Sequence, residues 1–346
     1  MSKRIVLTGG GTGGHIMPNL ALIPALTAAQ FDIHYIGLST DRDLVLTNSP
    51  QVTFHTINSV KLVRPHLHLS NALIPFKLVA NRKSAISILK QIKPDLVFSK
   101  GGFVSLPVML AAQKLGLPYI IHESDYSLGV SNKLCQRKAK VVLCSFASVS
   151  KKLKNAEHTG SPIRPLKGDK TRLDLSNFNP TLPTLLAVGG SSGAVAINDC
   201  IIKSLDLLLK QFNVLHITGK NQTEDIKRRG YLQIQFAHNM ADYIDASDFI
   251  VTRAGANALF EFVSLAKPTI AIPLPKSTSR GDQLQNAKYF FEKKCILVLQ
   301  QEDLTTVNLV NKLTELQSSK DILKQNCKGQ SKINGTQRIV EILINA

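Results

Sequence analysis

Two glycine-rich segments contain the residues with the clearest potential for chemistry. The first is GGGTGGH at residues 9–15, and the second is GGSSG at residues 189–193. Glycine allows positive φ angles and lets a ligand approach the backbone closely. Each segment stands between an apolar strand-like run and a helical pattern, so free N–H groups and the positive end of a helix dipole would favour phosphate. The pattern predicts two anion sites, although tight turns, or helix capping by Ser191 and Ser192, would give the same spacing.

The first segment also satisfies the dinucleotide pattern GxGxxG through Gly9, Gly11 and Gly14. A nicotinamide-binding fold requires an acidic residue at the end of the second strand, about 20 residues further on, to bind the ribose. Here that strand ends at residues 36–39 without an acid, and Asp41 comes later. The sequence therefore disfavours a nicotinamide-dependent oxidoreductase, and the glycine pattern alone assigns no function.

The elements that must position these segments alternate between strands and helices along the whole chain. In the first half we expect strands at 4–8, 33–38, 52–57, 95–100, 119–123 and 140–146, with helical patterns at 18–30 and 72–92. In the second half we expect strands at 184–188, 214–218, 232–236, 249–252, 269–272 and 296–299, with helical patterns at 194–211, 256–265 and 283–292. Such alternation predicts parallel sheets covered on both faces, with ligands outside the carboxyl ends of the strands.

A change in composition indicates where one domain ends and the next begins. Residues 159–183 are rich in Pro, Gly, Asn and charge, which predicts a linker. The predicted fold class is α/β, with two doubly wound domains facing a cleft. We expect an N-terminal domain at 1–163, a C-terminal domain at 164–330, and a helix at 331–346 that packs back on the N-terminal domain.

Seven segments carry a more specific signal when they are considered in chain order. They are GGTGGH at 10–15 with Pro18, GGFVS at 101–105 with Pro107, HESD at 122–125 followed by Gly129 and Asn132, TGSPIR at 159–164, GGSSGA at 189–194, RAGANALFE at 253–261 followed by Pro268 and Pro273, and DQLQNA at 282–287. In order and spacing this set resembles the MurG family of glycosyltransferases. The resemblance implies the GT-B architecture of two Rossmann-like domains and a role in peptidoglycan synthesis. It implies transfer of N-acetylglucosamine from UDP-GlcNAc to lipid I, which is undecaprenyl-diphospho-MurNAc-pentapeptide, giving lipid II.

The resemblance assigns donor-side roles in the second half of the chain. Glu261 would accept hydrogen bonds from both ribose hydroxyls of UDP, and Ala256 belongs to the same donor signature. Ser191 and the helix after it would face the diphosphate. The backbone near Ala237 would hold the uracil. The alternative for Glu261 is an ordinary helix acid, favoured by the helix dipole.

Two further donor-side residues have plainer alternatives. The resemblance implies that Gln283 contacts the sugar hydroxyls, where the alternative is a helix-surface amide. Arg164 would direct its guanidinium toward the donor, where the alternative is a surface arginine on a linker.

On the acceptor side the resemblance implies that Thr12, Gly13 and Gly14 meet lipid I through their N–H groups. His15 is the candidate general base, which would take the proton from the muramic acid 4-hydroxyl as that oxygen attacks C1 of the donor sugar. The alternative is that His15 only orients phosphate or stabilises the loop.

The HESD segment offers a second possible proton acceptor and one departure from the family. We expect His122 and Glu123, at a strand end, to open on the same cleft and to be able to take a proton. Asp125 stands where many family members carry asparagine, so a contact inferred from the amide is in doubt.

The implied reaction is a single inverting displacement without a covalent enzyme intermediate. The sequence shows no metal-ligand cluster and no DxD motif in a suitable loop. We therefore expect no metal and no cofactor, and dipoles and cations would stabilise the leaving group. Other two-domain enzymes, such as a UDP-GlcNAc epimerase or a lipid glycosyltransferase, would share the donor motifs, and dependence on the acceptor would separate them.

Composition indicates the partners and the compartment. The chain has 42 Lys and Arg against 24 Asp and Glu, a formal net charge of +18, which suits an anionic partner. Basic and apolar residues alternate over 61–93, with Lys61, Arg64, Lys77, Arg82 and Lys83 among them. This pattern predicts peripheral binding to anionic lipid on the cytoplasmic face of the bacterial cell membrane, although much of 72–92 would be a core-facing helix.

Other classes of protein are disfavoured by the same composition. Trp is absent and aromatic residues make up 6% of the chain, and no nucleic-acid-binding signature appears, so we expect no nucleic-acid partner. No apolar stretch approaches the ~20 residues that span a bilayer. The five cysteines form no CxxC pair, which predicts buried free thiols in a reducing cytosol.

Overall fold

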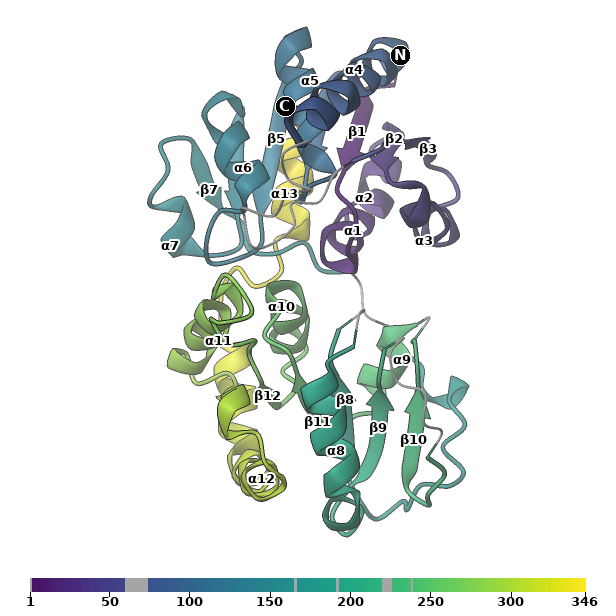
Figure 1. Ribbon diagram of the computed structural model, residues 1–346, viewed down its shortest axis with the longest axis vertical. Coiled ribbons are helices and arrows are strands. Elements are labelled where there is room, and N and C mark those ends of the chain that lie inside the picture. Colours follow the sequence, from purple (N-terminus) through teal and green to yellow (C-terminus); the bar gives the residue numbers. More distant parts are fainter. Residues whose placement is uncertain (1, 60–73, 165–166, 191–192, 220–225, 238) are drawn as a thin grey trace. The chain divides into compact units, whose positions relative to one another are not determined.

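A computed structural model describes residues 2–59, 74–164, 167–190, 193–219, 226–237 and 239–346, without the side chains of 74 and 75. The chain forms two compact units (Figure 1). The N-terminal unit comprises Met1–Arg164 together with Lys332–Ala346, and the C-terminal unit comprises Pro165–Ser331. Both units have parallel sheets with helical connections, which confirms the α/β, doubly wound fold class.

The N-terminal unit contains a seven-stranded parallel sheet in the order β3-β2-β1-β4-β5-β6-β7. Its strands are β1 (Arg4–Thr8), β2 (Asp32–Gly37), β3 (Thr53–Thr56), β4 (Leu96–Ser99), β5 (Tyr119–Glu123), β6 (Val141–Cys144) and β7 (Ala156–His158). Its helices include α1 (Gly13–Leu20), α2 (Ile23–Ala28), α3 (Arg42–Asn48), α4 (Ile74–Ile92), α5 (Ser105–Leu115), α6 (Val130–Cys135) and α7 (Ala147–Ser150). The strand order reverses between β1 and β4, so the loops after these two strands flank the switch point where doubly wound sheets bind ligands.

The last helix of the chain, α13 (Thr336–Ile344), belongs to the N-terminal unit (Figure 1). Ile339 and Leu343 are buried in the same apolar cluster as Ile5 and Leu7 of β1. The hydroxyl of Thr336 accepts from the backbone N–H of Ile163 at 2.9 Å and donates to the carbonyl of the same residue at 2.9 Å. The C-terminal segment therefore completes the core of the N-terminal unit.

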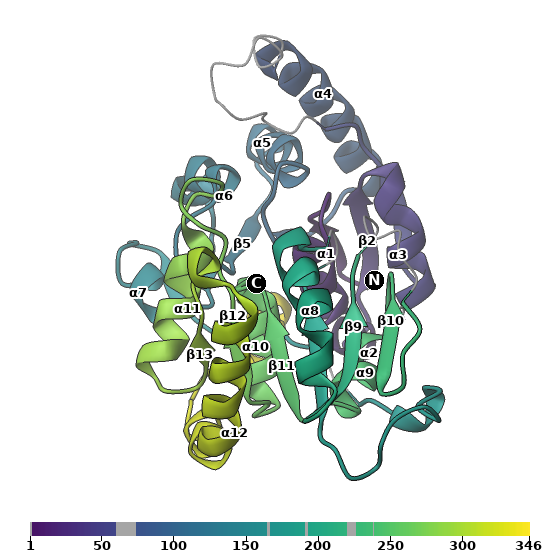
Figure 2. The ribbon, with the colours of Figure 1, turned by 60° about the horizontal axis from the view of Figure 1, so that its bottom comes forward.

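The C-terminal unit contains a six-stranded parallel sheet in the order β10-β9-β8-β11-β12-β13. Its strands are β8 (Thr184–Val188), β9 (Asn213–Ile217), β10 (Tyr231–Ile234), β11 (Phe249–Thr252), β12 (Thr269–Ala271) and β13 (Leu297–Val298), and its helices are α8 (Val195–Leu208), α9 (Met240–Asp245), α10 (Ala256–Ser264), α11 (Asp282–Glu292) and α12 (Thr306–Lys328). Helix α8 packs on β8 and β9, and α12 packs on α8 and β12 (Figure 2). The switch point lies between β8 and β11, because their order reverses there.

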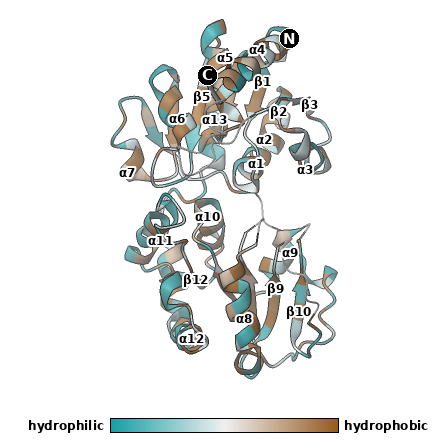
Figure 3. Cartoon of the chain, in the orientation of Figure 1, coloured by the Kyte–Doolittle hydropathy of each residue, from teal (hydrophilic) through white to brown (hydrophobic). Residues whose placement is uncertain are grey.

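Apolar residues concentrate in the strands of both units, whereas α11 and α12 carry many hydrophilic residues (Figure 3). The strands β4, β8, β9 and β11 are buried along their whole length, as parallel strands covered on both faces must be. All five cysteines are buried and free, as the sequence predicted. Within the described part of the chain, no helix is both long and apolar enough to cross a membrane.

One expectation about local structure was wrong, and another holds only in part. The helical pattern at 18–30 is divided between two helices. Helix α1 already begins at Gly13, and α2 is a separate helix with Pro24 in its first turn, where proline is favoured. The stretch at 159–183 is largely folded: Ser161 pairs with Asn334 in the N-terminal unit, and the N–H of Asp169 donates to Asp242 Oδ1 in the C-terminal unit at 2.8 Å. The boundary between the two units nevertheless falls within this stretch, after Arg164, where the composition predicted a linker.

Candidate functional site

The loop after β1 packs so tightly that glycine is required in it. A Cβ atom at Gly10 would lie 2.2 Å from Asp41 Oδ2, and one at Gly11, whose φ is +77°, would lie 2.4 Å from the ring of Phe103. The carboxylate of Asp41 accepts from the N–H of Gly11 at 3.2 Å and from that of Leu38 at 3.1 Å. Asp41, which comes too late to bind a ribose, thus fixes the glycine loop. Sequence reasoning missed this role because it depends on a turn between residues 38 and 41.

The first turn of α1 contains the predicted acceptor residues. Thr12 is the N-cap of α1, and its side chain makes no capping hydrogen bond, so the first N–H groups of the helix are not satisfied by that side chain. Thr12 and Gly14 are exposed, and a Cβ at Gly13 would meet open space. The geometry suits contact between this helix start and an anion.

His15 lies where the first glycine segment meets the GGFVS segment at 101–105. A Cβ atom at Gly102, whose φ is +84°, would lie 2.9 Å from His15 Cδ2 and 3.2 Å from Nε2. The imidazole, which is half-buried, therefore lies against the backbone of the loop that follows β4. Two segments far apart in the sequence thus come together at the switch point of the sheet.

A buried polar cluster lies at the carboxyl ends of β4 and β5. Lys100 Nζ is 2.6 Å from His122 Nδ1 and 2.5 Å from Ser124 Oγ, and Lys100 is only 2% exposed. His122 Nε2 is 3.0 Å from the carbonyl oxygen of Gly160, which can only accept, so Nε2 carries the proton and Nδ1 accepts from Lys100. Burial lowers the pKa of Lys100 to about 7, against the opposing attraction of Glu123 and Asp125.

The expectation that His122 and Glu123 open on a ligand site is wrong. His122 is fully buried with both ring nitrogens bonded, and burial together with the charge of Lys100 holds its pKa well below the ordinary value. Glu123 is 5% exposed and accepts from the N–H of Asp125 at 3.0 Å, the N–H of Gly129 at 2.8 Å and the amide of Asn132 at 2.9 Å. Burial and the nearby Asp125 raise the pKa of Glu123 to about 7. These two side chains shape the loop, whereas Asp125 is partly exposed beyond it.

In the C-terminal unit, the loop after β8 leads into α8 without a capping side chain. Gly193 has a φ of +77°, and a Cβ there would lie 2.4 Å from the carbonyl oxygen of Thr218. Ser191 and Ser192 lie outside the described residues, so the phosphate role of Ser191 stays a prediction. The N-cap of α8 is Ala194, which makes no side-chain capping hydrogen bond.

The loop after β11 forms the other side of the same switch point. The guanidinium of Arg253 donates to the carbonyl of Ile272 at 3.1 Å, and the amide of Asn286 donates to the carbonyl of Ala254 at 3.2 Å. Ala256, 3% exposed, is the first residue of α10 and can offer a ligand only its backbone. Glu261, half-buried, follows five residues later on α10. Arg253 and Asn286 therefore hold the start of the helix that carries Glu261.

Three other predicted residues have more limited chemistry than their types suggest. Gln283 Oε1 accepts from the N–H of Leu274 at 2.9 Å, which orients the side chain and leaves its NH₂ group to donate. Ala237 is 8% exposed, and its methyl group belongs to the apolar core, so only its backbone could contact a base. Arg164, the last residue of the first segment of the N-terminal unit, has a buried Nε without a hydrogen-bond acceptor among the described residues.

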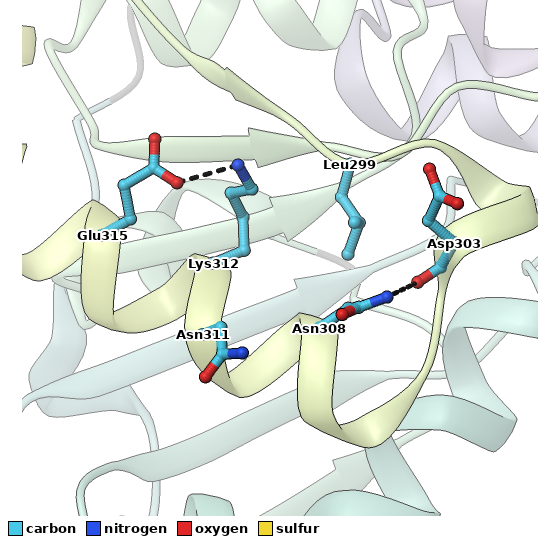
Figure 4. Close-up of a pocket in the computed structure, with 6 residues that line it drawn as sticks. All are labelled: Leu299, Asp303, Asn308, Asn311, Lys312 and Glu315. Carbon is cyan, nitrogen blue, oxygen red and sulfur yellow. Dashed lines mark hydrogen bonds and ion pairs between the residues drawn. The ribbon is translucent and has the colours of Figure 1, made fainter.

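A hollow of about 340 Å³ lies on the C-terminal unit, away from these residues. It is lined by Leu299, Asp303, Asn308, Asn311, Lys312 and Glu315 (Figure 4). Some of its polar groups already pair, since Lys312 bonds Glu315 at 2.8 Å and Asn308 donates to the carbonyl of Asp303 at 2.8 Å. It contains no predicted site residue, so it is not the candidate site. Among the described residues, no group of three or more His, Cys, Asp or Glu could hold a metal ion.

Comparisons with known proteins agree with the division of the chain. Residues 5–144 match the glycosyltransferase family 28 N-terminal domain, and residues 184–342 match the glycosyltransferase family 28 C-terminal domain. Two relatives are named UDP-N-acetylglucosamine–N-acetylmuramyl-(pentapeptide) pyrophosphoryl-undecaprenol N-acetylglucosamine transferase. The one from Clostridium botulinum is 40% identical over 99% of this chain and 98% of its own length. The one from Lachnospira eligens is 43% identical over 91% of each.

Solved structures give the same picture for the fold. The crystal structure of MurG from Acinetobacter baumannii is 25% identical, covers 99% of this chain and all of its own, and has a TM-score of 0.72. A calicheamicin glycosyltransferase is 13% identical with a TM-score of 0.72, over 99% of this chain and 97% of its own, a likeness that shows the fold alone. The nicotinamide-dependent alternative is thereby excluded in favour of glycosyl transfer.

Proposed function

The chain belongs to the MurG family of glycosyltransferases, and we propose that it transfers N-acetylglucosamine from UDP-GlcNAc to the muramic acid 4-hydroxyl of lipid I, giving lipid II. The observation that carries the proposal is 40% identity to a transferase named for these substrates, over 99% of this chain. A UDP-GlcNAc epimerase or another lipid glycosyltransferase is not favoured by any contact in the described residues.

The C-terminal unit binds the donor in this proposal. The diphosphate lies against the loop after β8 and the uncapped start of α8, where Ser191 adds a hydroxyl. Glu261 accepts from the ribose hydroxyls, and the NH₂ group of Gln283 donates to the sugar. The helix dipole and N–H groups stabilise the negative charge that UDP gains on leaving.

The backbone supplies the remaining donor contacts. Ala237 and Ala256 are buried, so their peptide groups rather than their methyl groups would face the uracil and the ribose. Arg164 adds a fixed positive charge that can donate to the diphosphate. Its buried Nε supports this role, because a buried donor needs an acceptor.

The N-terminal unit binds lipid I and activates it. The N–H groups at Thr12, Gly13 and Gly14 hold the acceptor, and Asp125 borders it. As the 4-hydroxyl oxygen forms its bond to C1 of the donor sugar, the bond from C1 to the UDP oxygen breaks and the configuration at C1 inverts. His15 takes the hydroxyl proton. The contact with Gly102 supports this role, because it holds the imidazole in place.

The proposal includes peripheral binding to the cytoplasmic face of the membrane, where lipid I is anchored. On α4, Phe76 is 75% exposed and Val79 is 55% exposed, beside the exposed Lys77. Apolar side chains flanked by basic ones suit an anionic lipid surface, and each basic residue contributes ~1 kcal/mol there. Lys61 and Arg64 lie outside the described residues. Changing Lys61, Arg64, Lys77 and Arg82 to Ser should weaken binding to anionic vesicles, and unchanged binding would contradict this part of the proposal.

A turnover assay with UDP-GlcNAc and a soluble lipid I analogue tests the function. UDP release should require the acceptor, because the reaction is transfer rather than hydrolysis. His15→Ala should lower kcat by about 100- to 10,000-fold through loss of the base. Glu261→Ala should raise the KM for UDP-GlcNAc by about 10- to 100-fold through loss of charged hydrogen bonds.

Glu292→Ala is the matched control for Glu261→Ala. Glu292 is an exposed helix acid whose ion pair among the described residues is with Lys288 at 3.6 Å, so both kinetic constants should stay at wild-type values. Acceptor-independent release of UDP by the wild type would overturn the proposed function. Near-normal constants in Glu261→Ala would remove the ribose assignment.

A further inference from the structure

Lys100 is a buried charged side chain to which the proposed reaction gives no role. It directly follows β4, and its backbone N–H donates to the carbonyl of Thr8 on β1 at 3.0 Å. It therefore lies at the switch point of the sheet. A Cβ atom at Gly9 would be 3.3 Å from Lys100 Cβ, so the lysine side chain also packs against the first glycine loop.

The burial of this side chain requires an explanation. Removing an ammonium group from water costs several kcal/mol unless it is paired. Here the pairing is to a neutral imidazole, His122, and a hydroxyl, Ser124, with the carboxylates of Glu123 and Asp125 attracting it from further away. An apolar side chain would fill the same space without that cost. The lysine instead adds side-chain hydrogen bonds between the residues that follow β4 and β5, which an apolar residue could not make.

The contacts lead from Lys100 to the residues proposed to meet the acceptor. Its next neighbour, Gly101, has a φ of +82°, and a Cβ there would lie 3.0 Å from the amide of Asn132. That amide also donates to Glu123 and to the carbonyl of His122. The following residue, Gly102, is the backbone on which the ring of His15 rests. This hydrogen-bonded cluster thus fixes the position of Gly101 and Gly102, next to His15, and the path of the loop that carries Asp125.

We propose that Lys100 is a positioning residue for the acceptor. By bonding to His122 at the end of β5 and to Ser124 after it, Lys100 fixes the backbone that contacts His15 and the loop that carries Asp125. This inference rests on the proposed function. It predicts a specific kinetic pattern, because the hydrogen bonds described for Lys100, His122 and Ser124 stay within the N-terminal unit and none of them is with Arg164, Glu261 or Gln283 of the proposed donor site.

Steady-state kinetics with the full chain test the inference, with UDP-GlcNAc and the lipid I analogue varied in turn. Lys100→Met should lower kcat/KM for the acceptor by about 10- to 100-fold, as a misplaced catalytic group does. The KM for UDP-GlcNAc should stay within about twofold of the wild-type value. Ser124→Ala should act in the same direction with a smaller effect. The double variant should be no worse than Lys100→Met, because Ser124 acts through the lysine.

Lys267→Met is the matched control. Lys267 is also partly buried, and its Nζ donates to the carbonyl of Ser247, which precedes the start of β11. That contact lies at the amino end of the sheet, so Lys267→Met should leave kcat/KM for the acceptor unchanged.

Each outcome has a defined meaning. Unchanged acceptor kinetics in Lys100→Met, or an equal rise in both KM values, would overturn the positioning role. If Lys100→Met does not fold, Ser124→Ala decides, and wild-type acceptor kinetics in that variant would also overturn it. Inactivity of the wild type would contradict the proposed function instead, so the two failures are distinguishable.

Discussion

Gly102 shows at the residue scale how backbone conformation and the position of His15, the proposed base, are linked in the N-terminal unit. Gly102 has a φ of +84° and also contacts His15, and these are separate constraints. Gly116 has a positive φ as well, but a Cβ there would contact no other residue. Gly116 ends α5 with a φ of +69°, and a Cβ there would meet nothing within 4 Å. Replacing each glycine by alanine therefore separates backbone strain from displacement of the imidazole.

The prediction concerns Gly102→Ala and Gly116→Ala. Both should lower stability by about 1 kcal/mol, because alanine resists a positive φ. Only Gly102→Ala should also lower kcat, by about 10- to 100-fold, since its Cβ pushes the ring of His15 away. Thermal unfolding and the turnover assay measure the two effects. Equal kcat values in the two variants would show that the contact between Gly102 and the His15 ring does not affect turnover.

His216 on β9 gives a pH-dependent prediction for the C-terminal unit. Its Nδ1 is 2.8 Å from the hydroxyl of Tyr231, and its Nε2 is 3.1 Å from Asn198 Oδ1. Burial lowers its pKa from 6.5 to about 4. Between these values the unfolded chain binds more protons than the folded one, so the stability from the neutral imidazole is present above pH 6.5 and is lost as the pH falls toward 4.

Urea unfolding of the wild type and of His216→Gln, at pH 7 and at pH 4.5, measures this contribution. The wild type should be the more stable at pH 7, because the glutamine cannot match both hydrogen bonds. The difference in the free energy of unfolding should shrink on acidification, at a rate of up to about 1.4 kcal/mol per pH unit. A difference that stays constant between the two pH values would rule out the shifted histidine.

The residue roles that sequence reasoning could predict are those carried by local patterns. The two glycine segments were identified from their position between strand and helix patterns and His15 from the family resemblance, and the structure brings residues 9–15 and 101–105 together, while the roles themselves stay predictions. Asp41 and Lys100 were missed, because their contacts depend on a turn and on the pairing of strands far apart in sequence. His122 and Glu123 were expected to open on a ligand, since a strand end does not reveal whether a buried cation already occupies the space beside it.

At the scale of elements, α13 shows how the end of the chain stabilises its beginning. Ile339 is fully buried against the core around β1, whereas Ile344 on the same helix is 38% exposed. Salt-bridge contacts add an outer attachment, with Arg338 Nε 2.7 Å from Glu157 Oε1. Because that pair is exposed, the apolar face should contribute most of the binding of α13.

The matching prediction compares Ile339→Ala with Ile344→Ala. The first should lower the free energy of unfolding of the N-terminal unit by about 2–5 kcal/mol, because it leaves a cavity. The second should cost less than about 1 kcal/mol, as for a partly exposed site. Hydrogen exchange of the amides in β1 and β4 reports on this unit alone. Equal loss of protection in both variants would show that α13 is not held by its buried face.

Most elements, but not all their ends, could be predicted from the sequence. Buried strands such as β8 and β11 are short apolar runs, and the structure has them within a residue of the expected bounds. Helix α1 begins five residues earlier than expected, because two glycines hid its start, and Pro24 divides the pattern that followed. The short β7 was missed, because Ala156–His158 is only half-buried and has no apolar run.

At the scale of the whole molecule, the two units share the same arrangement of sheet and glycine loop. Each unit has a doubly wound sheet with a glycine loop at its switch point, after β1 in one and after β8 in the other. Both loops lead into a helix without a side-chain capping hydrogen bond, but their surroundings differ: the first has the imidazole of His15 beside it, and the second lies in the unit that carries Glu261 and Gln283. We therefore assign the nucleotide to the second loop and the acceptor to the first.

Hydrogen exchange of the full chain with and without UDP tests this division most directly. The account predicts that UDP protects amides at 189–194 and 253–261 in the C-terminal unit and leaves those at 9–15 unchanged. Protection of residues 9–15 by UDP, with 189–194 and 253–261 unaffected, would contradict it.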